Sequence, residues 1–190
     1  MDQEVGYTVA GEAVVVNASS QEACIGAMAL PPWRSAVLSN CSLGEGRFIV
    51  LSSCERFHSL APHSRRQWIE ASWEHAYQLF GIASLKHICL WRSPKDRSIR
   101  EVELNLWFAP AGTACGIHNE HPFLEVHTQV NGLGIMQQFA HASRASLTGE
   151  IYMAPGYTHE PFADQSLIYP WHQYLAVSDC LWLAIEFHPS

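Results

Sequence analysis

The 190-residue chain contains 11 lysines and arginines, 18 aspartates and glutamates, and 11 histidines, so histidines are as numerous as the fixed cations. Charged residues make up 15% of the chain, against about 25% in an ordinary soluble domain, and the formal net charge is −7. This charge argues against nucleic acid or an anionic membrane as the main partner, because both are bound by clustered lysine and arginine.

No apolar run approaches the roughly 20 residues of a membrane-spanning helix, and the acidic start MDQEV lacks the cationic segment of a signal peptide. We therefore expect a cytoplasmic protein. The six cysteines are scattered without a C-x-x-C spacing. They favour buried free thiols over a disulfide framework or a zinc ribbon. The length is typical of one structural domain overall.

Residues 1–82 are weakly patterned and are expected to form an N-terminal extension with short strands. Ala13–Val16 and Phe48–Leu51 are short apolar runs of the kind that form buried strands.

One helix is predicted over residues 64–80. Ser64 opens a capping-box pattern with Gln67, and Gly81 follows as a stop signal. Between them, apolar residues recur on a single helical face: Ile69, Trp73, Ala76, Tyr77 and Phe80.

Residues 83–190 carry a strand pattern, with turns rich in Gly, Pro, Asn, Asp and Ser. The candidate strands are Leu85–Trp91, Glu103–Phe108, Phe123–Val130, Gly134–Phe139, Gly149–Met153, Tyr174–Val177 and Leu181–Phe187. Short strands at this spacing predict a sandwich or barrel rather than a βαβ fold.

Chemistry-bearing residues gather between positions 112 and 161. His118, His121 and His127 fall within ten positions, Glu125 lies among them, and His159 follows after a gap. In a strand over Phe123–Val130, one face carries only polar groups and one aromatic: Phe123, Glu125, His127 and Gln129. This face is either a solvent-facing edge or a barrel interior around a site, and the neighbouring histidines favour the interior.

A carboxylate with several imidazoles is a donor set for Fe(II), Mn(II), Ni(II), Cu(II) or Zn(II). Without a thiolate it is not typical of a structural zinc site. Three or four such ligands leave coordination positions for water, substrate or dioxygen.

The spacing of these residues resembles the two sequence motifs of the cupin superfamily. The first motif is G, five residues, H-x-H, three or four residues, E, six residues, G. This chain has Gly112-TACGI-His118-NE-His121-PFL-Glu125-VHTQVN-Gly132, in which H-x-x-H replaces H-x-H. The second motif is G, five residues, P-x-G-x-x-H, and here it is Gly149-EIYMA-Pro155-Gly156-YT-His159, one residue short.

The resemblance implies an all-β fold, a double-stranded β-helix (cupin or jelly-roll barrel) over residues 83–190, preceded by the extension of residues 1–82. It also implies His118, His121, Glu125 and His159 as metal ligands. The extra residue between the first two histidines is either absorbed by a β-bulge so that both bind, or only one binds and Asn119 or Glu120 takes the vacant place.

His127 is expected on the same side as Glu125 and is our candidate catalytic residue. It is a pocket acid or base, a donor that orients Glu125, a further ligand, or a plain core histidine. The run Tyr169–Tyr174, which contains His172, is aromatic and is expected either to wall a small-molecule pocket or to pack in the core.

The resemblance implies a metal-dependent enzyme acting on a small polar metabolite. We expect non-haem iron oxygenase or oxidase chemistry in specialised metabolism, with one divalent transition metal, Fe(II) being favoured over Zn(II), Mn(II) or Ni(II). Two other interpretations stay open: a divalent-metal cupin doing non-redox chemistry (an isomerase, a lyase or a nitrogen–nitrogen bond-forming step), and a non-catalytic small-molecule-binding cupin. Cupins also form homodimers by strand exchange, and residues 1–48 are the candidate for the exchanged strand.

Overall fold

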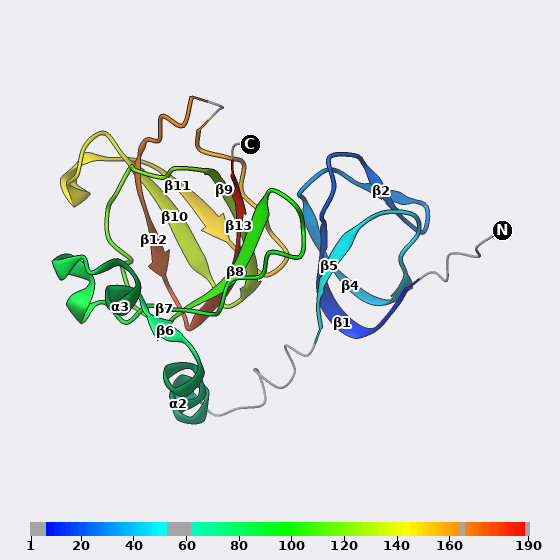
Figure 1. Ribbon diagram of the computed structural model, residues 1–190, viewed down its shortest axis with the longest axis horizontal. Coiled ribbons are helices and arrows are strands. Elements are labelled where there is room, and N and C mark those ends of the chain that lie inside the picture. The colour runs from blue at the N-terminus through cyan, green and yellow to red at the C-terminus, as the bar shows by residue number, and fades with distance from the viewer. Residues whose placement is uncertain (1–6, 53–61, 164–165, 189–190) are drawn as a thin grey trace.

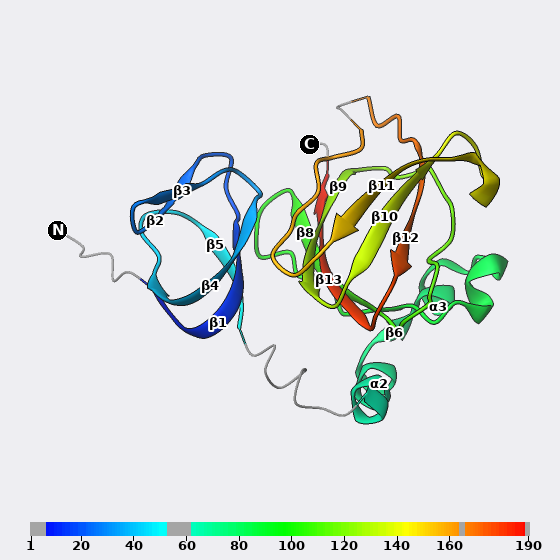
Figure 2. The same cartoon turned by 180° about the vertical axis from the view of Figure 1, so that it is seen from behind.

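The computed structural model describes residues 7–52, 62–163 and 166–188. A small N-terminal β-unit lies beside a larger β-barrel (Figure 1). The view from behind shows the same side-by-side arrangement (Figure 2).

The N-terminal unit is built on one long strand. β1 (Thr8–Asn17) pairs on one side with β4 (Ser35–Ser42) and on the other with β5 (Phe48–Leu51), and all pairs are antiparallel. A short hairpin, β2 (Ala23–Ile25) and β3 (Met28–Leu30), completes the unit. The predicted strands at residues 13–16 and 48–51 are therefore confirmed, whereas β2, β3 and β4 were not foreseen. One face of β1 has its own small apolar core: Val9, Ala13, Val15, Ile25, Leu30 and Leu43.

The single helix expected over residues 64–80 is wrong, because the chain breaks in its middle. α2 (Pro62–Ser72) ends before β6 (Glu74–His75), which pairs with β7 (Trp91–Arg92), and a separate short helix α3 (Ala76–Phe80) follows.

The capping box also lies elsewhere than predicted. His75 caps α3: its side chain accepts a hydrogen bond from the backbone of Tyr77, and Gln78 reaches back to the backbone of His75. Gly81 does end the helix, in the left-handed conformation with φ 67°. The break has a packing reason, since Ile69 belongs to one apolar core and Ala76 to another.

The strand expected at Leu85–Trp91 is mostly the 3₁₀ helix η1 (Ala83–His87), and only Trp91 is in a strand. Leu85 and Ile88 both pack against the core inside the barrel. Their spacing of three residues matches the three residues per turn of a 3₁₀ helix, so this geometry buries both side chains together.

The barrel consists of two facing antiparallel sheets. The larger has the order β6-β7-β8-β13-β9, and the smaller has the order β11-β10-β12. The bounds of the remaining strands are β8 (Val102–Ala109), β9 (Leu124–Asn131), β10 (Gly134–Phe139), β11 (Leu147–Met153), β12 (Trp171–Ala176) and β13 (Cys180–Phe187). A second 3₁₀ helix, η2 (Arg144–Ser146), precedes β11.

Two bridging segments extend the sheets and close the barrel. Ala114 and His118 bridge to β12, and Thr158 bridges to Thr128 on β9. The segment with Ala114 and His118, from the first motif, adds an edge to the smaller sheet. The segment with Thr158, from the second motif, adds an edge to the larger sheet. This all-β architecture, a double-stranded β-helix with an N-terminal extension, confirms the predicted fold class.

Side chains of β13 alternate between two apolar cores. Trp182 faces the barrel interior with Met136 and Tyr174. Leu183 and Ile185 face outwards, where they meet the second face of β1 and α2. The N-terminal unit therefore covers the outer surface of the larger sheet, and β1 is shared between its own small core and that of the barrel.

Polar contacts attach the N-terminal unit to the second motif. Ser35 Oγ donates to the Gly156 carbonyl oxygen at 2.9 Å, and Arg34 forms an ion pair with Glu160. Gly156 has a φ of 84°, and a Cβ atom there would lie 2.6 Å from a side-chain methyl of Val37. The glycine of the motif is thus required both by its backbone conformation and by the close approach of the N-terminal unit.

Among the described helices, none is both long enough and apolar enough to cross a membrane.

Because the two units share an apolar core, we expect them to unfold in one transition. Val16→Ala should lower the free energy of unfolding by about 2 kcal/mol, since it removes fully buried methyl groups. Urea titrations followed by far-UV circular dichroism and by tryptophan fluorescence should then shift together. Val177→Ala, at an exposed valine, is the control. Two separate transitions, only one of which responds to Val16→Ala, would show two independent domains.

Candidate metal centre

Strand pairing brings His118 and His172 together. The His118 amide donates to the His172 carbonyl oxygen at 3.0 Å, and the His172 amide donates back at 2.8 Å. Residues directly opposite in an antiparallel ladder carry their side chains on the same face. The two imidazole rings consequently lie side by side, with ring centroids 4.5 Å apart.

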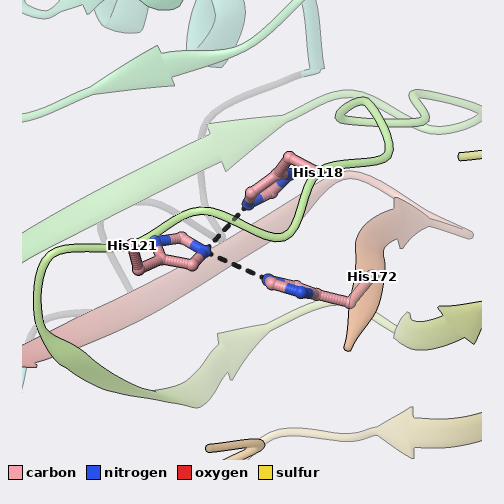
Figure 3. Close-up of side chains that lie close together, drawn as sticks. All are labelled: His118, His121 and His172. Atoms are coloured by element: carbon pink, nitrogen blue, oxygen red, sulfur yellow. Dashed lines mark hydrogen bonds between the residues drawn. The ribbon is translucent and has the colours of Figure 1, made fainter. Parts of the chain in front are cut away.

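His121 joins this pair from the loop that leads into β9. Its Nε2 atom lies 3.0 Å from Nε2 of His118 and 3.1 Å from Nε2 of His172, as Figure 3 shows. His118 is exposed, His121 is half-buried and His172 is buried, so the cluster leads from the surface into the barrel.

The remaining ring nitrogens fix the protons on two of these rings. Nδ1 of His118 lies 3.0 Å from the Gly116 carbonyl oxygen, and Nδ1 of His172 lies 2.8 Å from that of Pro170. A carbonyl oxygen can only accept, so Nδ1 donates in each pair and Nε2 of the neutral ring presents a lone pair to the cluster.

Burial keeps the imidazoles of His121 and His172 neutral near pH 7. Burial, together with repulsion from His118, lowers the pKa of His172 to about 3. Burial likewise lowers the pKa of His121 to about 4, with His118 and His127 adding to the effect and Glu125 opposing it.

The convergence of these nitrogens fits a divalent transition metal. The Nε2 lone pairs of His118 and His172 both point at Nε2 of His121, which either donates a proton to them or contributes a lone pair of its own to a shared cation. Two imidazole nitrogens bound at right angles to a metal at about 2.1 Å are also about 3 Å apart. Imidazoles without a thiolate are suited to Fe, Ni, Cu or Zn.

Glu125 supplies the negative charge beside this cluster. It lies on β9, its side chain is 12% exposed, and Oε2 is 3.9 Å from Nδ1 of His121. Burial alone would raise the pKa of this carboxyl, but His127, His121 and His118 outweigh it and lower the pKa to about 2. The Tyr169 hydroxyl holds the start of β9, because it accepts from the Glu125 amide at 2.9 Å and donates to the Phe123 carbonyl at 3.0 Å.

His127 lies next to Glu125 on the inner face of β9. Its Nε2 atom is 3.2 Å from Oε1 of Glu125, and its Nδ1 atom is buried and has no hydrogen-bond partner in the part of the chain that the structure describes. Thr128 faces the other way, towards Thr158. The structure thus agrees with the barrel-interior interpretation of this strand face.

The structure does not bring His159 to the imidazole cluster. Its Nε2 atom accepts from the His127 amide at 2.9 Å, and its Nδ1 atom lies 2.6 Å from the Glu160 carbonyl oxygen. Burial lowers its pKa to about 4, with repulsion from His127 second. A neutral His159 therefore joins the second motif to β9 through Nε2, while Nδ1 donates to the carbonyl oxygen of Glu160 beside it.

His172 was missed as a candidate ligand because the strand that contains it was predicted to begin at Tyr174. Extending the strand to Trp171 places His172, Tyr174 and Ala176 on one face. Alternation along this aromatic run was the signal that could have found it.

A second group of candidate ligands, Glu103, Glu186 and His188, lies at the same end of the larger sheet. Lys95 Nζ already pairs with Glu103 and lies 2.6 Å from Glu186, and Arg97 also pairs with Glu103. The hydrogen bond from Lys95, with a smaller effect of Arg97, lowers the pKa of Glu103 to about 2 against the effect of burial. Fixed cations balance these carboxylates, so this group does not need a metal.

No family model matches the chain, and no curated protein matches its sequence. Solved structures with a similar fold include one of DMSP lyases (16% identity, 60% of this chain and 55% of that chain, TM-score 0.43). Another is a cupin superfamily protein from Desulfitobacterium hafniense (12% identity, 57% of this chain and 88% of that chain, TM-score 0.40). A third is a cupin superfamily sugar phosphate isomerase from Silicibacter pomeroyi (14% identity, 53% of this chain and 60% of that chain, TM-score 0.41). The chain spans less than two thirds of the lyase and isomerase chains. The fold assignment rests on the strand order of this chain.

Stability of the metal-free protein should depend on pH through His121, His159 and His172. Their pKa values lie near 4, 4 and 3 in the folded state, below the ordinary 6.5, so the unfolded chain binds more protons between pH 6.5 and 4. The free energy of unfolding should therefore fall as the pH is lowered through this window, by up to about 1.4 kcal/mol per pH unit for each imidazole. Urea titrations at pH 7, 6, 5 and 4 measure this slope, and a flat profile would contradict the burial of neutral imidazoles.

Proposed function

We propose that the protein is a metal-dependent enzyme that binds one divalent transition metal at His118, His121 and His172, with Glu125 beside them, and acts on a small polar metabolite. The observation that carries this proposal is the convergence of three Nε2 atoms at 3.0 and 3.1 Å next to a buried, ionised carboxylate. A packing role for these rings does not require the Nε2 lone pairs of His118 and His172 to point at the same atom.

The ligand set leaves coordination positions for a substrate. Three imidazoles and at most one carboxylate do not complete the six positions that iron commonly uses. When bound, a divalent metal supplies a Lewis acid and, if it is iron, the electrons that dioxygen chemistry requires. The exposed His118 lies on the side from which a small molecule can approach.

The interior below the cluster is filled by aromatic side chains. Trp182 stacks on Tyr174 with ring centroids 4.1 Å apart, and Trp107 stacks on Trp182 at 6.4 Å. This aromatic floor restricts the reaction space to the upper part of the barrel. It favours a small substrate and excludes water from below.

His127 is the proposed proton-transfer group, as the sequence suggested. Its Nε2 atom is held by Glu125, which leaves the buried Nδ1 atom to take a proton from a substrate. Glu125 then stabilises the charge that develops on the ring.

Within this class we favour non-haem iron oxygenase or oxidase chemistry, because the donors are imidazole and carboxylate and the site combines open positions with aromatic walls. Non-redox catalysis on zinc or another divalent ion is the second candidate. The proton-accepting position of His127 beside the metal site also suits an isomerase or lyase.

Metal binding should depend on His172 more than on His159. Loss of a ligand in His172→Ala should weaken metal affinity by more than the roughly 10–100-fold typical of outer contacts. His159→Gln keeps a side-chain acceptor for the His127 amide and should fall within or below that range. Competition titrations of zinc and cobalt against a chromophoric chelator measure both variants.

The absorption spectrum of the cobalt-loaded protein is the second measurement, since removal of a ligand changes the visible bands. The reverse result, with His159→Gln losing metal and His172→Ala retaining it, would support the ligand set implied by the sequence motif, namely His118, His121, Glu125 and His159. Retention of metal by both variants would contradict both ligand sets.

The class of reaction is tested by comparing aerobic and anaerobic activity. We expect the iron-loaded protein to consume dioxygen in the presence of its substrate, and Glu125→Gln to lose most of this activity. An oxygen electrode with a panel of small hydroxy and amino acids measures the uptake. Full turnover of a substrate by the zinc-loaded protein without oxygen would instead establish the non-redox class.

A further inference from the structure

Three neighbouring strands place a short row of side chains across the barrel interior. Ala184 on β13 lies opposite Asn105 on β8 and opposite His127 on β9. Glu125 and Glu186 form the next row towards the imidazole cluster, and Trp182 lies in the next row towards the aromatic floor. The middle of the Asn105–Ala184–His127 row is thus a methyl group between two polar side chains.

Polar atoms without partners gather at this row. Asn105 Oδ1, His127 Nδ1 and Trp182 Nε1 are buried and have no hydrogen-bond partner among the described residues. The exposed fractions of these residues are 2%, 9% and 3%. Leaving a buried polar atom unpaired costs about 1–3 kcal/mol. Asn105 and His127 flank Ala184 on one face, and the His127 and Trp182 rings have centroids 6.2 Å apart, so one missing partner accounts for the three atoms more simply than three separate defects.

The contacts of each side chain determine what that partner must offer. Asn105 Nδ2 donates to Glu186 Oε1 at 2.7 Å, so Asn105 Oδ1 remains as an acceptor. His127 Nε2 faces the Glu125 carboxylate, which can only accept, so Nδ1 of the neutral ring is also an acceptor. The indole nitrogen of Trp182 can only donate.

We propose that Asn105, His127 and Trp182 form a substrate subsite for a hydroxyl or primary amide group. A primary amide donates two N–H bonds and accepts on its oxygen, which matches two acceptors and one donor, whereas a hydroxyl has one proton and pairs with the Trp182 donor and one of the two acceptors. The proposal rests on the proposed metal centre, because the subsite is placed to hold the far end of a substrate whose other end is bound at the metal.

The position of the subsite defines the length of the substrate. Glu125 and His127 are two residues apart along β9, about 6.6 Å in an extended strand. The imidazole cluster lies beyond Glu125, because Glu125 faces Nδ1 of His121 and the cluster forms at Nε2 on the other side of that ring. This distance is therefore a lower limit, and it favours a molecule in which at least three carbons separate the anionic or chelating group from the hydroxyl or amide. The stack of Trp182 on Tyr174 lies beyond the subsite and excludes longer chains.

Calorimetric titration of the zinc-loaded protein with matched pairs of acids tests the subsite. The pairs are propionate with 3-hydroxypropionate and butyrate with 4-hydroxybutyrate, which differ by one hydroxyl. We expect the hydroxyl to strengthen binding about 10-fold in at least one pair, which corresponds to one well-made hydrogen-bond set.

Matched variants assign this gain to the subsite. Trp182→Phe removes the indole donor but keeps an aromatic ring in the stack, and it should lose most of the gain from the hydroxyl. Trp107→Phe is the same change at the residue directly opposite on β8, and it should keep the gain. Asn105→Leu and Gln173→Leu form a second pair, in which the first should lose the gain from the hydroxyl and the second should keep it. Gln173 is a suitable match because its carbonyl oxygen is also buried with no partner among the described residues, while its amide donates to Gln137 outside the proposed subsite.

The outcomes separate the subsite from the metal centre. Absence of stoichiometric zinc in the unmodified protein contradicts the metal centre and the subsite that rests on it. Full zinc content with no gain from a hydroxyl in either pair contradicts the subsite alone, as does an equal loss in Trp107→Phe and Trp182→Phe. A crystal structure of the ligand-bound protein in which an ordered water alone joins the three atoms would also overturn it.

Discussion

The alternation of side chains along β13 is the constraint on which both halves of the molecule depend. Leu183 and Ile185 present an apolar outer surface that would be exposed on an isolated barrel, and the N-terminal unit and α2 cover it. The inward-facing residues of β13 are Trp182, Ala184 and Glu186. Trp182 belongs to the aromatic stack in the interior, Glu186 belongs to the charged group near the imidazole cluster, and Ala184 lies between them. A shift of this strand by one residue would exchange the two sets, so that the covering surface and the site would be lost together.

The imidazole cluster depends on a backbone contact rather than on a compact sequence motif. His118 and His172 are 54 positions apart in the chain but exchange two amide hydrogen bonds. His159 is nearer in sequence, yet its ring replaces a backbone acceptor for the His127 amide. In this barrel the second motif contributes rigidity to the strand that carries Glu125, while the next strand contributes the third imidazole.

Much of the barrel could be predicted from the sequence because apolar and polar residues alternate where one face is buried. The strand at Gly134–Phe139 and the polar inner face from Glu125 to Gln129 follow from this alternation. The helix break at Trp73–His75 could not be foreseen, since the apolar spacing is continuous and only the position of two separate cores interrupts it. The role of His172 was equally hidden, because it depends on which strands pair across the sheet.

The attachment of β1 to the outer face of the larger sheet has a consequence for the order of folding. Val14 and Val16 precede Leu183 and Ile185, with which they share an apolar core, by 169 positions each. Until β13 is made, this face of the N-terminal sheet lacks part of its apolar cover. Such contacts of high sequence separation form slowly and leave apolar strands open to association with other chains. Newly made protein should therefore need protection by chaperones until β13 has been synthesised, although the finished fold conceals the surface that requires it.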